Sequence, residues 1–318
     1  MDIGLGLPTF CTGERTVSPA TIRWWAERAE REGAAGLWTI DHLVKPFTYR
    51  SSALDPLTAL TYAGAVTDDV TLGTSILILP LRRTATVASA VASLQHLAGR
   101  RVVLGLGAGY ERREFEAVGV PMEERGPRLS EGVEVLSRLF RGEASFDGRF
   151  HDFEEVRIDP VPERPPRILA GGSSGESDGE RSFATPIVDR ILSVEGWIAP
   201  PTGPARVGTE RSLLADGARE RGVDPDGVET VVLTYCHLAE GDGPAVRDAQ
   251  RRAFEDMYED VLGWEYALEN CLTGTVTEVQ DALVAYERAG VDQLAVSPCV
   301  HGDEALREQM NLYAEHLL

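Results

Sequence analysis

The feature that most constrains the fold of this chain is a regular alternation of short apolar runs with amphipathic segments. The apolar runs have the length of buried strands, and most are separated by segments with apolar residues at helical spacing. The predicted strands cover residues 3–8, 36–40, 70–79, 101–106, 167–170, 196–199, 230–238 and 293–297. Strands that are apolar along their whole length are typical of a parallel sheet buried on both faces.

Helix signals lie between these runs. Ser18-Pro19 predicts a helix start, since Ser suits the N-cap and Pro the first helical position, and Gly33 ends that helix. Asp55-Pro56 predicts a second start. Further helices are predicted over 55–66, 84–97, 128–140, 211–221, 245–262 and 277–289, and a hairpin over 145–158.

Eight strands, nearly all separated by helices, in 318 residues favour an α/β fold of the (β/α)8 TIM-barrel type. A doubly wound open sheet is the alternative, and it predicts a GxGxxG motif directly after the first strand. Residues 3–15 contain no such motif. We therefore expect one domain over residues 1–318, with loop insertions at the C-terminal mouth around residues 42–54 and 171–190.

The net charge of the chain restricts the kinds of partner that it can bind. A net charge of −20 argues against nucleic acid and against an anionic membrane surface. Lys45 is the only lysine among 31 basic residues, and an acidic, lysine-poor surface suits a halophile, although a GC-rich genome also replaces Lys with Arg. The N-terminus lacks the pattern of a signal peptide and no apolar run could span a bilayer, so we expect a cytoplasmic protein.

No metal site is expected. Cys11, Cys236, Cys271 and Cys299 are scattered without metal-ligand spacing, and buried structural thiols are the expected role. The HExxH and P-loop motifs are absent from the sequence.

In a TIM barrel the residues that follow each strand line the active site. Two glycine-rich ends, Gly107-Ala108-Gly109 and Gly171-Gly172-Ser173, expose backbone amides that can converge on the phosphate of a cofactor, although a tight turn explains each one alone equally well. Asp41-His42 is the predicted acid/base pair, because histidine titrates near neutrality and a neighbouring carboxylate can fix its tautomer.

Tyr110 and Glu111 lie just past a glycine turn, where a phenol or carboxylate can donate a proton or bind substrate. Glu114 follows in the same segment. The alternative for both glutamates is a helix N-terminus, where the helix dipole favours acidic side chains.

The order of these motifs resembles that of the bacterial luciferase-like flavin and deazaflavin oxidoreductases. The resemblance rests on the following segments, in chain order: Gly36-Leu37-Trp38-Thr39-Ile40-Asp41-His42, Asp55-Pro56, Leu72-Gly73-Thr74-Ser75-Ile76, Leu81-Arg82, Leu94-Gln95-His96-Leu97, Leu104-Gly105-Leu106-Gly107-Ala108-Gly109-Tyr110 with Glu114, Gly119-Val120-Pro121 with Arg125, Pro165-Pro166-Arg167-Ile168, Gly171-Gly172, Gly196-Trp197-Ile198 and Gly274-Thr275. It covers most of the chain except residues 173–190 and 200–260.

The resemblance implies a barrel with a cofactor in its mouth and a non-prolyl cis peptide at Ser75-Ile76, forming a bulge behind the cofactor ring. Gly107, Ala108, Gly109, Gly171, Gly172 and Ser173 would border the phosphate and ribityl chain. Both coenzyme F-420 and FMN occur in the family, and Ser-Ile at the bulge is closer to the F-420-dependent branch. Members similar to sugar-phosphate dehydrogenases carry glutamate where Tyr110 stands, so that acid role does not transfer.

We therefore expect an F-420-dependent enzyme that transfers a hydride to or from a small organic substrate, with His42 as proton partner, oriented by Asp41 or by a backbone group. Tyr110 or Glu111 would contact the substrate. A reduced-FMN monooxygenase and a non-catalytic flavin-binding barrel are the alternatives. The resemblance also implies a homodimer.

Overall fold

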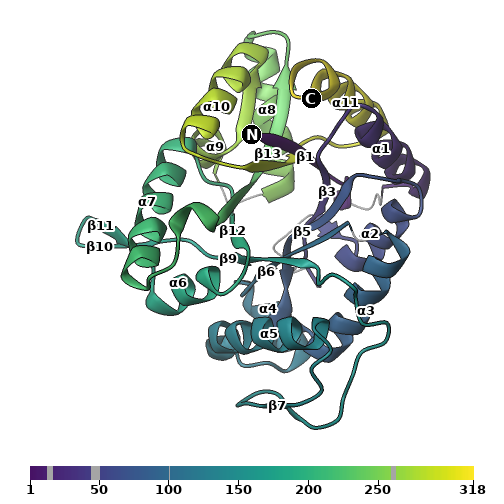
Figure 1. Cartoon of the computed structure of the whole chain (residues 1–318). Helices are drawn as coiled ribbons and strands as arrows, with labels where there is room; N and C mark the ends of the chain where they lie inside the picture. Colours follow the sequence, from purple (N-terminus) through teal and green to yellow (C-terminus); the bar gives the residue numbers. More distant parts are fainter. Residues whose placement is uncertain (13–16, 44–50, 100, 259–262) are drawn as a thin grey trace.

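Parallel strands close into a barrel at the centre of the molecule (Figure 1). The computed structural model describes residues 1–12, 17–43, 51–99, 101–258 and 263–318. The barrel strands are β1 (Asp2–Gly6), β3 (Gly36–Thr39), β5 (Thr71–Ile78), β6 (Val102–Gly107), β9 (Arg167–Gly171), β12 (Gly196–Ala199), β13 (Glu229–Ala239) and β15 (Gln293–Pro298). Pairings β12–β13 and β1–β15 complete the ring, which confirms the predicted TIM barrel and all of its predicted strands.

Helices surround the strands on the outside (Figure 1). They are α1 (Pro19–Arg31), α2 (Pro56–Gly64), α3 (Thr84–Leu97), α4 (Arg112–Val118), α5 (Arg125–Phe140), α6 (Thr185–Leu192), α7 (Pro204–Glu220), α8 (Pro244–Tyr258), α9 (Trp264–Asn270), α10 (Val276–Arg288) and α11 (Asp303–His316). Short 3-10 turns are η1 (Leu79–Leu81), η2 (Met122–Glu124) and η3 (Pro225–Gly227). The predicted caps are present: Ser18 accepts the Thr21 N–H and Asp55 accepts the Thr58 N–H.

Smaller strands decorate the barrel. β14 (Leu272–Thr275) extends the sheet beside β13. Three antiparallel pairs are β2 (Phe10–Thr12) with β4 (Ser51–Ala53), β7 (Phe146–Asp147) with β8 (Asp152–Phe153), and β10 (Gly175–Ser177) with β11 (Glu180–Ser182). The β7–β8 pair confirms the hairpin predicted over 145–158.

The barrel interior is packed around Trp38, which is 1% exposed. Trp38 shares one buried cluster with side chains from other strands, among them Val103, Leu169, Ile198 and Val231. Gly4 and Gly73 on the neighbouring strands leave room for the indole, since a Cβ on either would lie 2.4 Å from an indole atom. This packing closes the interior below the strand ends where the site lies.

The segment over residues 171–190, expected as a loop insertion, contains the β10–β11 hairpin and the first part of α6. One expected helix boundary was wrong. Helix α7 begins at Pro204 rather than at 211, and its first turn follows a proline at the favoured first position. Most of the predicted 42–54 loop, with Lys45, lies outside the described residues.

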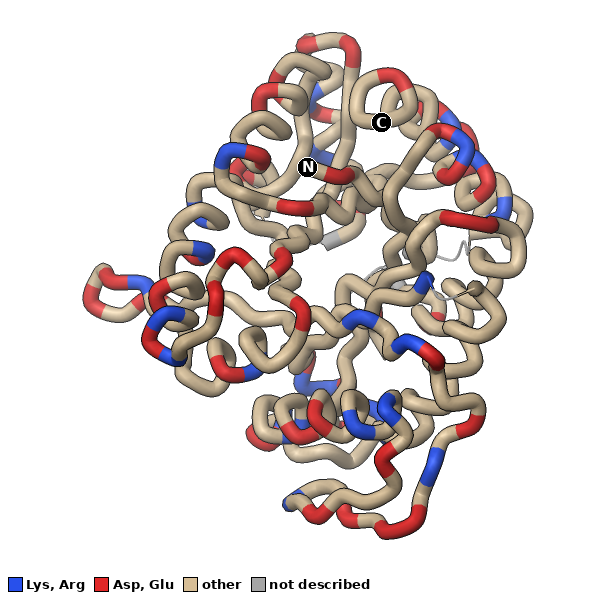
Figure 2. Tube along the Cα trace, viewed as in Figure 1, with Lys and Arg blue, Asp and Glu red and all other residues tan. Residues whose placement is uncertain are grey.

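Charge is spread over the outside of the barrel. Figure 2 shows Asp and Glu distributed over the outer helices and the loops that connect them. Of the helices that the structure describes, none is long and apolar enough to cross a membrane.

Candidate active site

A cavity of about 810 Å³ opens where the barrel strands end. Most of the residues that the sequence predicted for the site line it together, from four successive strand ends. They are Asp41, His42, Ser75, Ile76, Gly107, Ala108, Gly109, Tyr110, Gly171, Gly172 and Ser173. Glu111 is not among the lining residues.

The Ser75-Ile76 peptide bond is cis, as the resemblance implied. The register between β5 and β6 shifts between Thr74 and Leu77, so the chain bulges at this point. Two glycines on β6 accommodate the bulge: a Cβ on Gly105 would lie 2.1 Å from the Thr74 carbonyl oxygen, and one on Gly107 would lie 2.2 Å from Ile76 Cδ1. The glycine at 107 therefore has a packing reason as well as a place on the cavity wall.

His42 follows β3 and its side chain is 20% exposed at the cavity. Its Nδ1 lies 3.5 Å from Oε2 of Glu114, a carboxylate with no exposed surface. The Tyr110 ring stands edge-on to the imidazole, with ring centroids 6.0 Å apart. The carboxylate beside the imidazole is thus a glutamate from α4, and the sequence analysis did not assign Glu114 this position.

Asp41 contacts different groups. Its Oδ2 accepts hydrogen bonds from Arg82 Nη1 at 2.5 Å and from the Ile78 N–H at 2.8 Å, and its Oδ1 accepts one from Arg82 Nη2 at 3.0 Å. Burial raises the pKa of Asp41, while Arg82 and the Ile78 N–H act in the opposite direction. Asp41 therefore joins the end of β3 to the end of β5.

Tyr110 and Glu111 lie at the start of α4. Tyr110 is 57% exposed and lines the cavity mouth. Glu111 is the N-cap of α4 and accepts the Arg113 N–H at 3.1 Å. Its geometry matches the helix-start alternative, and its predicted contact with substrate stays a prediction.

One side of the cavity carries its arginines. Arg125 and Gly126, in the first turn of α5, and Arg190 of α6 all line it. Arg190 donates to Ser130 Oγ from Nε and Nη2, at 3.2 and 3.0 Å, and its burial lowers its pKa. Helix N-termini and guanidinium groups both attract anions. Sequence reasoning missed Arg190, since nothing local links a residue inside a helix to the mouth.

The lining fits a phosphate-bearing ring cofactor. The Ser75 hydroxyl is buried, lines the cavity and has no hydrogen-bond partner among the described residues. Glycines at 107, 109, 171 and 172 keep the backbone accessible on the wall next to it. The opposite wall is largely apolar and includes Ile198, Leu233 and Tyr235. An apolar cavity with a few convergent polar groups is the usual form of a cofactor site.

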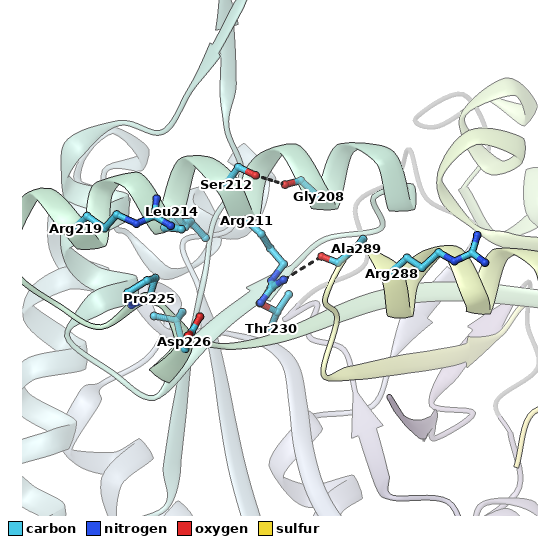
Figure 3. A pocket seen from close by; sticks show the side chains of 12 residues that line it. Gly208, Arg211, Ser212, Leu214, Arg219, Pro225, Asp226, Thr230, Arg288 and Ala289 are labelled. Atoms are coloured by element: carbon cyan, nitrogen blue, oxygen red, sulfur yellow. Dashed lines mark hydrogen bonds between the residues drawn. The ribbon is translucent and has the colours of Figure 1, made fainter.

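A second hollow of about 320 Å³ lies near the N-terminal ends of the strands, between α7, α10 and the start of β13 (Figure 3). Figure 3 shows Arg211 pointing between Thr230 and Ala289. Its Nε donates to Thr230 Oγ1 and its Nη1 to the Ala289 carbonyl, both at 3.0 Å. Arg211 thus ties α7 to the end of α10, which is a structural role.

The other polar residues considered from the sequence lie elsewhere. His237, on β13, is not among the residues lining the larger cavity, and burial lowers its pKa to about 4. Burial raises the pKa of the Cys236 and Cys271 thiols to about 12 and raises that of Cys299 well above its usual value. Within the described part of the chain, no group of three or more His, Cys, Asp or Glu could hold a metal ion.

Comparison with known proteins identifies a family that the chain matches. Residues 1–293 match the family model described as luciferase-like monooxygenase. The F420-dependent hydroxymycolic acid dehydrogenase of Mycobacterium tuberculosis is 33% identical over 208 residues, which cover 63% of this chain and 54% of that protein. The chain spans about half the length of the curated relatives it matches.

Solved structures share the fold. An F420-dependent secondary alcohol dehydrogenase, solved with an F420-acetone adduct, has a TM-score of 0.81 at 16% identity, covering 99% of this chain and 98% of that one. The monooxygenase RslO1 from Streptomyces bottropensis also has a TM-score of 0.81, at 24% identity, covering 100% and 98%. At these identities the likeness concerns the barrel and not the reaction.

Proposed function

The chain belongs to the luciferase-like monooxygenase family, and from that premise we propose that it is a coenzyme F-420-dependent oxidoreductase. It would transfer a hydride between the deazaflavin and a small organic substrate. The observation that carries the proposal is the gathering of His42, the Ser75-Ile76 bulge and both glycine-rich strand ends around one cavity. The F420-dependent dehydrogenase that is 33% identical supports the choice of cofactor.

Different residues of the chain would bind different parts of the cofactor. The bulge at Ser75-Ile76 would back the ring, with the Ser75 hydroxyl as a free hydrogen-bonding group. Backbone at Gly107–Gly109 and Gly171–Ser173 would border the tail, and Arg125 and Arg190 would hold its phosphate. Once bound, the deazaflavin supplies or accepts the hydride.

His42 would handle the proton. A hydride transfer to or from an alcohol or carbonyl carbon needs a matching proton transfer at the oxygen, and a histidine can perform it near neutral pH. His42 is the histidine among the cavity's lining residues. Tyr110, edge-on to it at the mouth, would contact the substrate.

The apolar wall sets the class of substrate. Ile198, Leu233 and Tyr235 offer no charge, and the Tyr266 hydroxyl donates to the Pro201 carbonyl at 2.6 Å. The cavity's arginines lie on the α5–α6 side that we assign to the cofactor phosphate. We therefore propose a neutral, small organic substrate.

A reduced-FMN monooxygenase is the second candidate, favoured by the family's description and by the likeness to RslO1. Two assays separate the candidates. Anaerobic oxidation or reduction of F-420 by a panel of small alcohols and ketones supports the first. Oxygen uptake with reduced FMN, with no F-420 turnover, supports the second. Binding of either cofactor without turnover in both assays indicates a non-catalytic flavin-binding barrel.

We also propose a cellular environment and an oligomeric state for the enzyme. The net charge of −20 with a single lysine, Lys45, suits a cytoplasmic enzyme of a halophile. Residues 1–318 would form one domain, working as a homodimer without nucleic-acid or membrane partners. Thermal unfolding and light scattering across a KCl series test this. An unfolding temperature that does not rise with salt would contradict the halophilic setting, and the mass of a single chain at every salt concentration would contradict the homodimer.

A further inference from the structure

Glu114 is a buried carboxylate beside His42 that has no role in the chemistry proposed above. Helix α4 buries only Glu114 and Phe115. Glu114 has no exposed surface, although the rest of its helix offers solvent-facing positions such as Glu116. Burying a carboxylate is costly unless it meets hydrogen-bond donors. Helix-dipole stabilisation needs no burial, so it does not account for this placement.

Glu114 lies against the segment that follows β3. Its Oε1 accepts the Leu43 N–H at 2.6 Å, and its Oε2 lies 3.5 Å from His42 Nδ1. The carboxylate therefore touches the backbone just after His42 and the ring of His42 itself. Asp41 is engaged differently, with both oxygens bonded to Arg82 and one also to the Ile78 N–H.

We propose that Glu114 is the positioning residue that fixes the tautomer of His42. An ionised carboxylate only accepts hydrogen bonds, so the ring nitrogen that faces it must carry the proton. Neutral His42 is then protonated on Nδ1, and its Nε2 is left as the proton acceptor. The consequence for turnover rests on the proposed function, but the tautomer itself does not.

Glu114→Gln makes the proposal testable, because the amide can keep one contact and reverse the other. Its carbonyl oxygen can still accept the Leu43 N–H, which puts the NH2 group opposite His42 Nδ1. An NH2 group only donates, so Nδ1 must become the acceptor and the ring proton must move to Nε2. Glu116→Gln, on the exposed side of the same helix, removes the same charge and is the matched control.

The experiment is a long-range ¹H–¹⁵N correlation spectrum of histidine-labelled full-length protein, without cofactor, at mildly alkaline pH. The His42 signals are assigned by their loss in His42→Asn. We expect the Nδ1–H pattern in the native protein and in Glu116→Gln, and the Nε2–H pattern in Glu114→Gln. An Nε2–H pattern in the native protein, or an unchanged pattern in Glu114→Gln, overturns the proposal. Should Glu114→Gln not fold, the native spectrum still decides.

Turnover supplies a separate readout. Reversing a catalytic histidine's tautomer costs as much as about 10⁴ in kcat in the serine-protease triad. We expect kcat of Glu114→Gln to fall at least about tenfold while cofactor affinity is retained, and Glu116→Gln to keep native kcat. The spectrum needs no turnover, so the expected tautomers in a protein that does not turn over F-420 contradict the proposed function alone.

Discussion

At the scale of single residues, His42 is flanked by two buried carboxylates that contact different groups. Asp41 bonds to Arg82 and to the Ile78 N–H, whereas Glu114 bonds to the Leu43 N–H and faces the imidazole. Adjacency in sequence favoured Asp41 as the partner of His42. In the structure the carboxylate beside the His42 ring is instead that of Glu114, which belongs to a helix far along the chain.

Replacing His42 by Ala tests its assignment as the proton partner. We expect kcat to fall about 10²- to 10⁴-fold, the usual contribution of general acid–base catalysis, while cofactor binding is largely retained. Steady-state kinetics and a binding titration give the two quantities. His96→Ala, on the exposed face of α3, is the matched control. Native turnover in His42→Ala would remove His42 from the mechanism.

Gly105→Ala tests the role of glycine beside the bulge. The added Cβ would lie 2.1 Å from the Thr74 carbonyl oxygen, a backbone atom that cannot move without shifting β5. Overpacking of this kind costs about 1–3 kcal/mol, and denaturant unfolding measures it. Gly175→Ala, where a Cβ meets open space, should leave stability nearly unchanged. Equal stabilities of the two variants would show that β5 and β6 yield easily there.

At the scale of elements, Arg82 joins three segments beneath the site. It bonds to Asp41 after β3 and to Asp55, the N-cap of α2, and it follows η1 at the end of β5. The Arg82 side chain is 12% exposed and that of Asp41 is fully buried. The ion pair therefore holds the strand ends that carry His42 and the bulge.

Arg82→Met should destabilise the protein by about 3 kcal/mol or more, because it leaves a buried carboxylate without its cation. Thermal and denaturant unfolding measure the loss. Arg83→Met, next in the chain and exposed, is the control and should change little. Adding Asp41→Asn to Arg82→Met should recover part of the stability. A single variant as stable as the native protein would contradict this account of the ion pair.

Element type was predictable for the barrel strands and for most of the longer helices. The barrel strands are short segments dominated by apolar residues and glycine, so their positions followed from the sequence. Helices α4, α6, α9 and α11 were not predicted. Helix α11 has fourteen residues, but it follows Gly302, which offers no side-chain cap. Helices α4 and α9 have seven residues each and α6 has eight, and α6 begins with a Thr-Pro pair that also suits a loop. Short segments of this kind are helical only because the barrel gives them a surface to pack on.

The site residues that follow strands were predictable from the sequence, whereas those on helices were not. Strand ends of a barrel converge, so residues such as His42, Gly107 and Gly171 could be assigned to one site from their positions after strands. Glu114 and Arg190 reach the site from helices, and their contacts depend on how those helices dock. No local pattern encodes that docking.

For the molecule as a whole, two histidines make the stability of the fold depend on pH. Burial lowers the pKa of His237 from 6.5 to about 4 and also lowers the pKa of His301. Above pH 6.5 both histidines are neutral in the folded and in the unfolded chain, so their burial does not lower the free energy of unfolding there. As the pH falls from 6.5 towards 4, the unfolded chain takes up protons that the folded chain does not, and stability declines.

His237→Gln should make this decline shallower, since one of the buried titrating groups is gone. Unfolding free energies measured between pH 7.5 and pH 4.5 give the slope. His96→Gln removes an exposed histidine and should keep the native slope. Identical slopes in all three proteins would mean that His237 is not held neutral in the fold.

We propose that the cavity at the strand ends binds coenzyme F-420. The most direct measurement is a pair of binding titrations of the purified full-length protein in molar KCl, one against F-420 and one against FMN. We expect tight binding of F-420 and weak binding of FMN. Tight FMN binding with no detectable affinity for F-420 would contradict it and direct the search to oxygen-consuming chemistry.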